Sequence, residues 1–449
     1  MDRYLIVGAG RSALGATRLL LRDGHSVTIS DIEEKFPGSL ADIRSSGALV
    51  VIGPQGIDLL DGIDRIVVSP GLSPRIPLLL EARARKIPIL SEIDVALERF
   101  DGTVVGVTGT NGKSTSTLLL AHFLKASGVD AEASGNIGIA PSLILASGKV
   151  PEAFVLELSS YQLDYSARIN NRVSLFMSFA PDHMERHGTL EAYFLAKWKL
   201  IEACDGLVVL PRKILEFAQK FVAPPPRAKI AQILIDDEQL FPFGQSIAVH
   251  IDSKLQTVRS ELLASPSKFP MPLEIHNQLN VAAALVASHF LAPNVDPLPS
   301  LLNFTWLPYR FQNIGTIKGQ PVYNDSKSTN VESTEIALQS LTKPCVLLLG
   351  GASKGESYAP LLSQSQKILK LISFGASAPQ INRDLADLSP TTYPSLKAAL
   401  GALPALLQSI EAPLVFSPAN ASFDEFNNFE ERGQFFNTTL APLLDPKNS

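Results

Sequence analysis

The chain has 449 residues, of which 45% are hydrophobic and 18% charged, so it is long enough for about three domains with ordinary cores. A net charge of −5 and a pI near 5.9, with no long basic run, argue against nucleic-acid binding through a basic face. The two cysteines, Cys204 and Cys345, lie far apart, which argues against a disulfide framework or a cysteine metal site.

The N-terminus leads directly into an apolar strand and lacks the long hydrophobic stretch of a signal peptide. No later run is long enough to cross a bilayer. We therefore expect a cytoplasmic protein that binds neither membranes nor nucleic acid.

The first segment, residues 1–93, begins like a Rossmann unit. A strand at Tyr4–Val7 is followed by a glycine-rich turn, a helical run and a second strand at Ser26–Ser30. Asp31 stands about 20 residues beyond the glycines, where a ribose contact is expected. NAD is the obvious ligand for this pattern, another nucleotide diphosphate is the alternative, and a purely structural turn is the third possibility.

The second segment, residues 94–293, contains the strongest motif of the chain. The strand Val104–Val107 breaks into the turn Thr108–Thr115, and an apolar helical pattern follows. Gly109 and Gly112 let backbone N–H groups approach a phosphate, and Lys113 can neutralise its oxygens. A hydroxyl of the following Ser114 or Thr115 can bind Mg²⁺. The glycine spacing departs from a strict Walker A motif, and the alternative is a plain turn with its lysine in solvent. A phosphate cradle also argues against a simple dehydrogenase.

Two further strands of this segment end in polar residues. Glu157 lies near the end of an apolar strand that begins at Phe154, where it suits a Mg²⁺ ligand; the alternative is a carboxylate on an edge strand. His183 follows a strand predicted at Val173–Phe179, which we expect to neighbour the strand of Glu157. We therefore expect His183 to bind metal or substrate.

A helix is predicted at Leu190–Leu200, where Lys197 or Lys199 could belong to a solvated face. Residues 205–275 are less informative, with short strands at Ile230–Ile235 and Ala248–Ile251. The amides of His276–Asn280 precede an alanine-rich helix at Val281–Phe290; they could cap it or bind a base edge.

The last segment, residues 294–449, follows a proline-rich linker, Ala292–Pro299, which is the expected hinge. Four apolar strands end at polar, glycine or proline loops, which predicts a second doubly wound sheet with one functional edge. That edge would carry Asp325, Lys327 and Lys354. The predicted strands are Val346–Leu349, Leu371–Phe374, Leu414–Phe416 and one that closes with the polar turn in residues 322–330.

Along its whole length the chain resembles the Mur ligase family. The motifs that carry the resemblance are Gly109–Thr115, Gly135–Gly138, Glu157–Ser160, Asp182–Met184, His276–Asn277 with Asn280, Leu307–Phe311 and Asn324–Lys327. Within the family, the run Ser417–Phe429 is similar to the D-glutamate side of the member that adds this amino acid.

The resemblance implies an α/β enzyme of three domains: a Rossmann-like domain (1–93) for a UDP-linked substrate, a central P-loop-type domain with a parallel sheet (94–293) for ATP and Mg²⁺, and a Rossmann-like C-terminal domain (294–449) for the amino acid. It also implies that the last domain closes on the others. The implied reaction activates a carboxylate of UDP-N-acetylmuramoyl-L-alanine as an acyl phosphate, which the amine of D-glutamate then attacks. We expect small-molecule substrates only, and a monomer.

The resemblance also assigns site residues. It implies that Lys113, Glu157, His183 and Lys197 are catalytic, with two Mg²⁺ ions held by Ser114, Thr115, Glu157, His183 and Lys197 as a carbamate. ATP would be bound by Gly109, Thr110, Asn111, Gly112, Lys113, Ser114, Thr115, Asn277, Asn280, Arg310, Asp325 and Lys327. The UDP substrate would contact Arg11, Ser12, Asn136, Gln162 and His183. D-Glutamate would contact Thr329, Lys354, Ser422, Phe423 and Phe429.

Two stretches depart from the family's pattern. Pro211–Lys213 replaces an Asn-x-Asp-Asp element, and Ile32-Glu33 stands where a threonine–arginine pair is familiar, so that Glu33 would repel a diphosphate if it faced inward. Four alternatives remain open: the L-alanine-adding member of the family, a folylpolyglutamate synthetase, a nucleotide-binding switch or scaffold without ligase activity, and a dehydrogenase.

Overall fold

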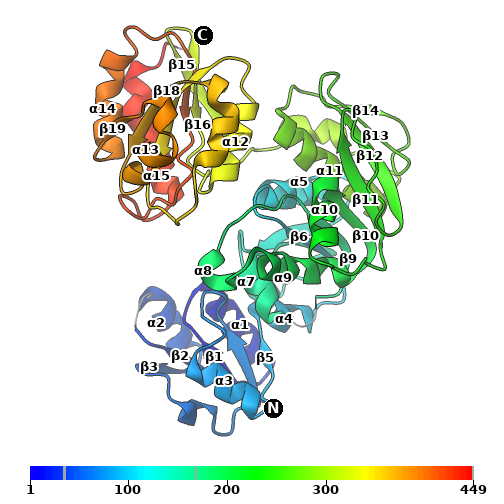
Figure 1. Ribbon diagram of the computed structural model, residues 1–449. Coiled ribbons are helices and arrows are strands. Elements are labelled where there is room, and N and C mark those ends of the chain that lie inside the picture. The colour runs from blue at the N-terminus through cyan, green and yellow to red at the C-terminus, as the bar shows by residue number, and fades with distance from the viewer. Residues whose placement is uncertain (34–36, 167–168, 447–449) are drawn as a thin grey trace. The chain divides into compact units, whose positions relative to one another are not determined.

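The computed structural model describes residues 1–33, 37–166 and 169–446, without the side chains of Arg11 and residues 37–40. Three sheets follow one another along the chain (Figure 1). The chain divides into two compact units, Met1–Phe304 with the first two sheets and Thr305–Ser449 with the third. The predicted α/β class with parallel sheets is confirmed.

The first sheet is wholly parallel, with the strand order β3-β2-β1-β4-β5. Apolar residues of β1 alternate between the two faces: Tyr4 and Ile6 pack towards α1, whereas Leu5 and Val7 pack towards α3. The elements are β1 (Arg3–Val7), α1 (Arg11–Arg22), β2 (Ser26–Asp31), α2 (Pro37–Ser45), β3 (Leu49–Ile52), β4 (Arg65–Val68), α3 (Pro77–Ala84), β5 (Ile89–Leu90) and α4 (Glu92–Leu97).

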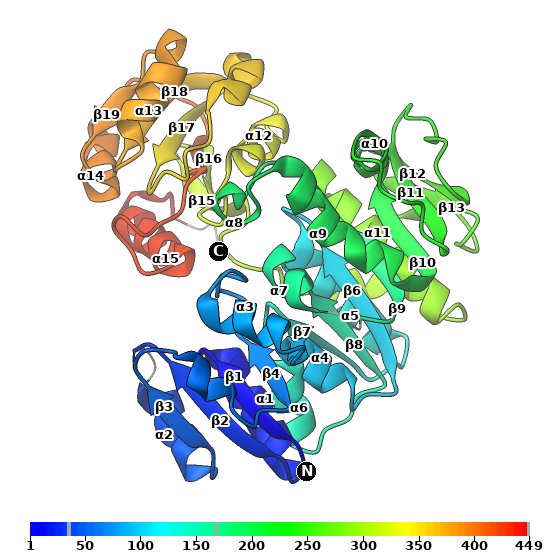
Figure 2. The same cartoon turned by 60° about the horizontal axis from the view of Figure 1, so that its bottom comes forward.

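The second sheet has the order β14-β13-β12-β11-β10-β9-β6-β8-β7. Its pairs are parallel except β12 with β13 and β13 with β14, which are antiparallel. Figure 2 shows the strands from β6 to β13. Its strands are β6 (Thr103–Thr108), β7 (Ala131–Gly135), β8 (Ala153–Glu157), β9 (Asn171–Phe176), β10 (Cys204–Pro211), β11 (Lys229–Ile235), β12 (Ser246–Asp252), β13 (Thr257–Ser260) and β14 (Ser267–Lys268). Its helices are α5 (Lys113–Ala126), α6 (Pro141–Ala146), α7 (Ser160–Tyr165), α8 (Met184–His187), α9 (Leu190–Glu202), α10 (Arg212–Lys220) and α11 (Ile275–Leu291).

The strand that precedes His183 differs from its prediction in two ways. β9 ends at Phe176 rather than Phe179, because the chain turns there to bond the neighbouring loop: the Ser178 carbonyl accepts the N–H of Thr110 at 2.8 Å. The expectation that this strand neighbours the strand of Glu157 is also wrong. β6 pairs with β8 on one side and with β9 on the other.

The first two sheets share one buried apolar cluster. It runs from β1 and α1 through α4 and α6 to Phe154 and Leu156 of β8. A side chain on Gly15 of α1 would meet the Ser142 hydroxyl oxygen of α6 at 2.4 Å, so the helices pack closely only because this residue is glycine. The first sheet is thereby fixed against the second.

In the second unit, the order β15-β16-β20-β17-β18-β19 is parallel except for β15. Leu347 and Leu349 pack towards α12 and α13, and Val346 and Leu348 towards α14 and α15, so helices cover both faces. The elements are β15 (Gln312–Ile317), β16 (Gln320–Asn324), α12 (Val331–Gln339), β17 (Cys345–Gly350), β18 (Ile368–Phe374), α13 (Ala378–Asp384), β19 (Thr391–Tyr393), α14 (Leu396–Leu406), β20 (Leu414–Phe416) and α15 (Phe429–Leu440).

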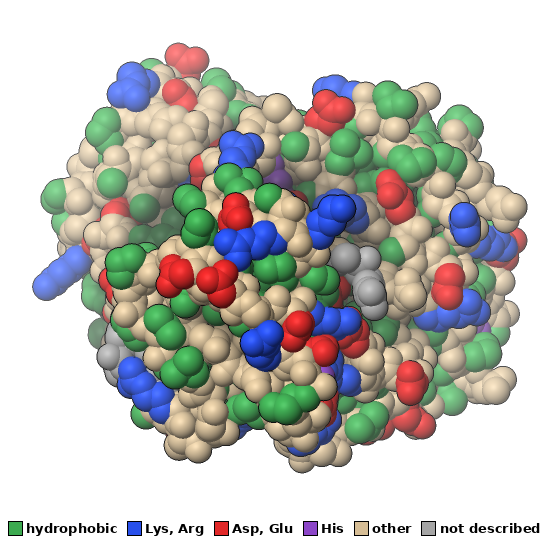
Figure 3. All heavy atoms as spheres, turned by 90° about the horizontal axis from the view of Figure 1, so that it is seen from below, with side chains coloured by type: hydrophobic (Ala, Val, Ile, Leu, Met, Phe, Trp, Pro, Cys, Tyr) green, Lys and Arg blue, Asp and Glu red, His purple; other side chains and the backbone are tan. Residues whose placement is uncertain are grey.

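Positive and negative side chains are interspersed over the molecular face in Figure 3. Within the described part of the chain, no helix combines the length and hydropathy that a membrane crossing requires.

Candidate active site

The loop between β6 and α5 can only be built with glycine at two positions. Gly109 has φ +145°, and a Cβ there would lie 3.0 Å from the backbone nitrogen of Ser178. Gly112 has φ +82°, and its Cβ would lie 2.9 Å from Oδ1 of Asn280. The sequence-predicted order of strand, glycine turn and helix is confirmed.

A neighbouring segment braces this cradle. The N–H of Asn111 donates to the Ser178 hydroxyl at 2.8 Å, and the Thr110 hydroxyl accepts the N–H of Ala180 at 3.1 Å. The N–H groups in the first turn of any helix have no partner within that helix, and they attract anions. The first turn of α5 is therefore the part of the cradle suited to a phosphate.

Lys113 does not extend into solvent, so that alternative is wrong. Its half-buried side chain folds back over the loop, and Nζ donates to the carbonyls of Gly109 at 2.9 Å and Thr110 at 2.8 Å. A phosphate in the cradle would compete with these two oxygens for the ammonium group.

Lys197 is buried beside the same loop. Its side chain is 2% exposed, and Nζ donates to the Gly109 carbonyl at 2.8 Å and lies 4.7 Å from the centroid of the Tyr193 ring. Burial, and then the positive charge of Lys113, hold the pKa of Lys197 well below its usual value. Lys199 is exposed, so of the two predicted lysines only Lys197 is buried beside the loop.

Glu157 is buried at the end of β8, with 2% of its surface exposed. Nδ2 of Asn136 donates to Oε1 at 2.8 Å, whereas Oε2 is buried and has no hydrogen-bond partner among the described residues. Because β8 lies between β6 and β7, the alternative of an edge-strand carboxylate is wrong.

These residues fit a Mg²⁺ ion. A buried carboxylate oxygen without a donor is costly unless a cation binds it, and Mg²⁺ takes oxygen ligands. Ser114 and Thr115 place buried hydroxyls in the first turn of α5. Over residues 1–33, 37–166 and 169–446, no three His, Cys, Asp or Glu side chains form a group that could hold a metal. Hydroxyl groups or a modified lysine would therefore have to complete each of the two expected Mg²⁺ sites.

His183 begins α8 in a left-handed conformation, with φ +58°. Its Nδ1 lies 3.3 Å from the Tyr161 hydroxyl and 3.6 Å from Oε1 of Glu185, and its Nε2 lies 3.5 Å from Oδ2 of Asp182. Its side chain is 39% exposed, which leaves it accessible to a ligand.

The glycine-rich turn of the first sheet is closed by Asp31. Its Oδ2 accepts the N–H of Ala9 and its Oδ1 that of Ile32, both at 2.7 Å. The carboxylate that a ribose would need therefore already holds the turn together. Ser12 is half-buried on α1, Glu33 is exposed, and the side chain of the predicted Arg11 lies outside the described residues.

Two amides have structural roles of their own. Oε1 of Gln162 accepts the N–H and hydroxyl of Ser159 in a capping box of α7, which leaves its amide nitrogen for a substrate. Oδ1 of Asn280 accepts the Ser116 hydroxyl at 3.1 Å, which places Asn280 beside the cradle. Since α11 begins at Ile275 with Glu274 as its N-cap, the alternative that Asn277 and Asn280 cap this helix is wrong.

In the second unit, Asp325 is buried behind the predicted edge. Its carboxylate accepts the Phe311 N–H at 2.9 Å and the hydroxyls of Ser328 and Ser417. Burial raises the pKa of Asp325 to about 6. The carboxylate thus fixes the segment that carries Arg310, the other residue predicted for adenosine.

The other predicted residues of this unit fall into two groups. Nζ of Lys327 lies 4.8 Å from the centroid of the Phe429 ring, so these two predicted residues are in contact. Thr329 is half-buried and Ser422 is buried, whereas Lys354 is exposed and Phe423 is 74% exposed. An exposed phenylalanine gains by covering a ligand.

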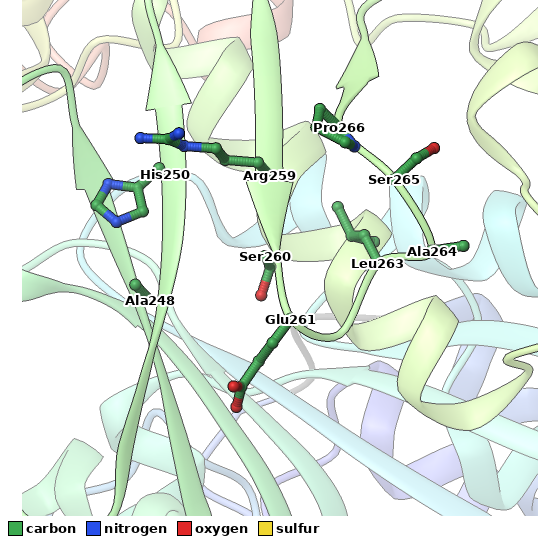
Figure 4. Close-up of a pocket in the computed structure, with 9 residues that line it drawn as sticks. All are labelled: Ala248, His250, Arg259, Ser260, Glu261, Leu263, Ala264, Ser265 and Pro266. Atoms are coloured by element: carbon green, nitrogen blue, oxygen red, sulfur yellow. The ribbon is translucent and has the colours of Figure 1, made fainter.

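A hollow of about 400 Å³ lies on β12, β13 and the following loop (Figure 4). His250 and Arg259 lie side by side at one end, and Glu261 at the other. None of the predicted site residues lines it.

Family comparisons agree with this geometry. Residues 2–91 match the profile described as "Mur ligase MurD-like, N-terminal domain", and residues 107–288 match "Mur ligase middle domain". The chain is 32% identical to the UDP-N-acetylmuramoylalanine--D-glutamate ligase of Synechococcus sp. (strain CC9605), over 99% of this chain and 100% of that protein. The chain belongs to the Mur ligase family.

Other relatives of this Mur ligase agree. The enzyme of the same name from Halalkalibacterium halodurans is 30% identical over 98% of this chain and 97% of the relative. Two solved structures share the fold: a pseudomurein peptide ligase type C from Methanothermus fervidus (TM-score 0.61, 17% identity, 98% of this chain and 100% of that one) and the MurF ligase of Thermotoga maritima in complex with ADP (TM-score 0.59, 16% identity, 93% and 95%).

Sequence reasoning missed three residues beside the site of this Mur ligase. Tyr193 contacts both Thr110 and Lys197; its spacing of four residues from Lys197 on one helix could have revealed it. Arg432 is buried in α15 and donates to Ser326, Asn420 and Ala421. Arg186 of α8 has a side chain of which only 8% is exposed. An arginine in a polar helix usually predicts an exposed face, so no sequence signal marked these two arginines.

Proposed function

We propose that the chain is the ATP-dependent ligase that joins D-glutamate to UDP-N-acetylmuramoyl-L-alanine in peptidoglycan precursor synthesis. The curated relatives at 30–33% identity over nearly their full length, all UDP-N-acetylmuramoylalanine--D-glutamate ligases by name, support this substrate pair. A nucleotide ligand is supported by the ADP bound to the MurF ligase of the same fold.

One observation carries the proposal: the buried Glu157 with an unpaired oxygen and the buried Lys197 belong to the same sheet region as the glycine cradle. A switch or scaffold that only binds nucleotide needs no second buried amine there. A reaction between ATP and a carboxylate substrate does need concentrated positive charge, because both reactants are anions.

The reaction has two steps. A carboxylate oxygen of the L-alanyl group attacks the γ-phosphorus of ATP, the bond to the β-phosphate oxygen breaks, and ADP leaves. The unprotonated amine of D-glutamate then attacks the carbonyl carbon of the acyl phosphate, inorganic phosphate leaves, and the nitrogen loses one proton. In this scheme the cradle Gly109, Thr110, Asn111, Gly112 and Lys113 orients the triphosphate, and Lys113 exchanges its carbonyl partners for phosphate oxygens.

Ser114, Thr115 and Glu157 would hold one Mg²⁺, and His183 and Lys197 a second. When bound, these ions would reduce the electrostatic repulsion between ATP and the substrate carboxylate. An ammonium cannot bind Mg²⁺, so we propose that Lys197 reacts with CO₂ to form a carbamate and release a proton. Its burial favours the neutral amine that this reaction requires.

The remaining assignments follow the same scheme. The UDP substrate is assigned to Arg11, Ser12, Asn136, Gln162 and His183; adenosine to Asn277, Asn280, Arg310 and Asp325, with Lys327 near the phosphates; and D-glutamate to Thr329, Lys354, Ser422, Phe423 and Phe429. The corresponding domains are residues 1–93, 94–293 and 294–449. We propose a cytoplasmic monomer with these small molecules as its only substrates.

An amino-acid panel tests the substrate. With ATP, Mg²⁺ and UDP-N-acetylmuramoyl-L-alanine, phosphate release should require D-glutamate and should not respond to L-glutamate or L-alanine. Release with L-alanine and the unalanylated sugar would instead identify the L-alanine-adding ligase, and release with a folate and L-glutamate a folylpolyglutamate synthetase. No phosphate release with any set would favour a nucleotide-binding scaffold.

A further inference from the structure

Arg186 of α8 has a largely buried side chain, of which only 8% is exposed, whereas 39% of the His183 side chain is exposed. Nη1 donates to the carbonyl of Leu72, and Nε lies 3.3 Å from Oδ2 of Asp164 in α7. The arginine therefore connects α7 and α8, which follow β8 and β9 of the second sheet, to the loop that follows β4 of the first sheet (Figures 1 and 2).

That loop, residues 69–72, supports the glycine-rich turn. The Ser69 hydroxyl donates to the carbonyl of Gly8 at 3.1 Å, and the N–H of Leu72 donates to the carbonyl of Ser69 at 3.1 Å. A Cβ on Gly8 would lie 2.6 Å from the Ser69 hydroxyl oxygen. The position of the loop therefore decides the position of the turn.

Arg186 shares the Leu72 carbonyl with a second donor. The hydroxyl of Tyr165 in α7 also reaches this oxygen, at 2.8 Å. The guanidinium carbon of Arg186 lies 5.5 Å from the centroid of the Tyr165 ring. Two side chains of the second sheet's helices thus hold one carbonyl of the first sheet's loop.

The guanidinium also packs against a tyrosine that contacts His183. Its central carbon lies 4.9 Å from the centroid of the Tyr161 ring. The Tyr161 hydroxyl donates to Oε1 of Glu185 at 2.9 Å and lies 3.3 Å from Nδ1 of His183. The ring that orients His183 is therefore packed against Arg186.

We propose that Arg186 is a positioning residue. It holds the UDP-binding turn of the first sheet in a fixed position relative to His183, which follows β9 of the second sheet. The inference rests on the proposed function for the identity of the two sites. Nη2 of Arg186 is buried without a hydrogen-bond partner among the described residues, which costs stability. A contact that served stability alone would not leave Nη2 unpaired. The hydrogen bonds of the planar guanidinium group and its stacking on the tyrosine rings both require arginine rather than lysine.

UDP and ADP, titrated separately by calorimetry into the full-length protein with Mg²⁺, test the inference. UDP is the probe of the turn, and neither nucleotide is assigned to Arg186. Arg186→Gln should weaken UDP binding about tenfold, as expected for the loss of a charged hydrogen bond, and change ADP binding less than about twofold. Arg172→Gln is the matched control, because Arg172 also pairs with an aspartate and stacks on a phenylalanine, but lies in β9 rather than in α7 or α8; it should change neither.

Equal weakening of UDP and ADP by Arg186→Gln, or unchanged UDP binding, would overturn the inference. If Arg186→Gln does not fold, Tyr165→Phe decides, because it removes only the second donor to the same carbonyl. A selective loss of UDP affinity supports the tie, and unchanged UDP affinity overturns it. A wild-type protein that binds no UDP would instead overturn the proposed function itself.

Discussion

Lys113 and Lys197 donate to the same oxygen, the backbone carbonyl of Gly109, at 2.9 and 2.8 Å. Two ammonium ions on one carbonyl would repel each other, and Lys197 is the more deeply buried, so Lys197 is the one whose pKa falls well below its usual value. The cradle of this Mur ligase thus brings two lysine side chains to one backbone carbonyl, and burial favours the neutral amine at Lys197.

A neutral Lys197 is required if it is to be carbamylated. Lys197→Arg should therefore lower kcat by about 10²–10³-fold, because a guanidinium does not form the carbamate and leaves the site short of anionic oxygens. Lys199→Arg, two residues away and exposed, is the control. Mass spectrometry of native protein kept in CO₂ should find one added CO₂ on Lys197; a bare amine under those conditions would contradict the assignment.

Glu157 should control the metal requirement. Glu157→Gln keeps the shape but removes the charge of the unpaired oxygen, so the Mg²⁺ concentration for half-maximal activity should rise more than about tenfold. Glu132→Gln on the adjacent strand, where the carboxylate pairs with Lys149, should leave the Mg²⁺ titration unchanged. An unaltered titration in Glu157→Gln would remove this residue from the metal site.

The glycines of the chain allow a matched test of the cradle. Gly112 and Gly128 have φ of +82° and +86°, but only at Gly112 would a Cβ meet other atoms. Both alanine variants should lose about 1–2 kcal/mol of unfolding free energy from the backbone conformation. Only Gly112→Ala should also weaken ATP binding, measured by titration. Equal ATP affinity in both variants would mean that the turn is not the phosphate site.

Glu92 predicts how stability depends on pH. Burial is the main cause that raises the pKa of this carboxyl from 4.5 to about 7, although the Ser142 N–H donates to it at 2.8 Å. Its folded-state pKa lies above the unfolded value, so the stability from the protonated form is complete below about pH 4.5 and is lost as the pH rises through 7.

Glu92→Gln removes this titration. At pH 8 the free energy of unfolding of the variant should be about 3 kcal/mol larger than that of the wild type. Below pH 5 the two free energies should converge, as measured by urea denaturation. A constant difference between the two proteins at all pH values would show that folding does not raise the pKa of Glu92.

Arg432 should act on D-glutamate recognition through the backbone that it holds. It donates to the carbonyls of Ser326, Asn420 and Ala421, next to the residues assigned to the amino acid. Lysine cannot make these bonds together, so Arg432→Lys should raise the KM for D-glutamate about tenfold with little change in the KM for the UDP substrate. Arg383→Lys, an exposed position of the same unit, is the control. A uniform loss in both KM values would indicate a general folding defect instead.

Local patterns were enough to predict the cradle and the three sheets. A glycine turn between an apolar strand and a helix depends on neighbours in sequence, so Gly109, Gly112 and the helix after the turn could be predicted. The exact start of that helix could not, because α5 begins at Lys113, inside the predicted turn Thr108–Thr115. The same holds for Glu157, because an acidic residue that ends a buried strand is visible in the sequence alone.

What sequence could not supply are contacts between distant segments. Helix spacing alone could not decide whether Lys197 or Lys199 is buried; the packing of α9 on the cradle decides it. The early end of β9 follows from hydrogen bonds to a loop 67 residues away. The role of Arg186 depends on a carbonyl 114 residues away in the chain.

The central claim is that an acyl phosphate forms between the alanyl carboxylate and the γ-phosphate. UDP-N-acetylmuramoyl-L-alanine labelled with ¹⁸O in that carboxylate tests it most directly, by mass spectrometry of the phosphate released with ATP, Mg²⁺ and D-glutamate. The account predicts that each released phosphate carries one oxygen from the substrate carboxylate. Release of phosphate that contains no ¹⁸O, together with formation of the amide, would contradict it.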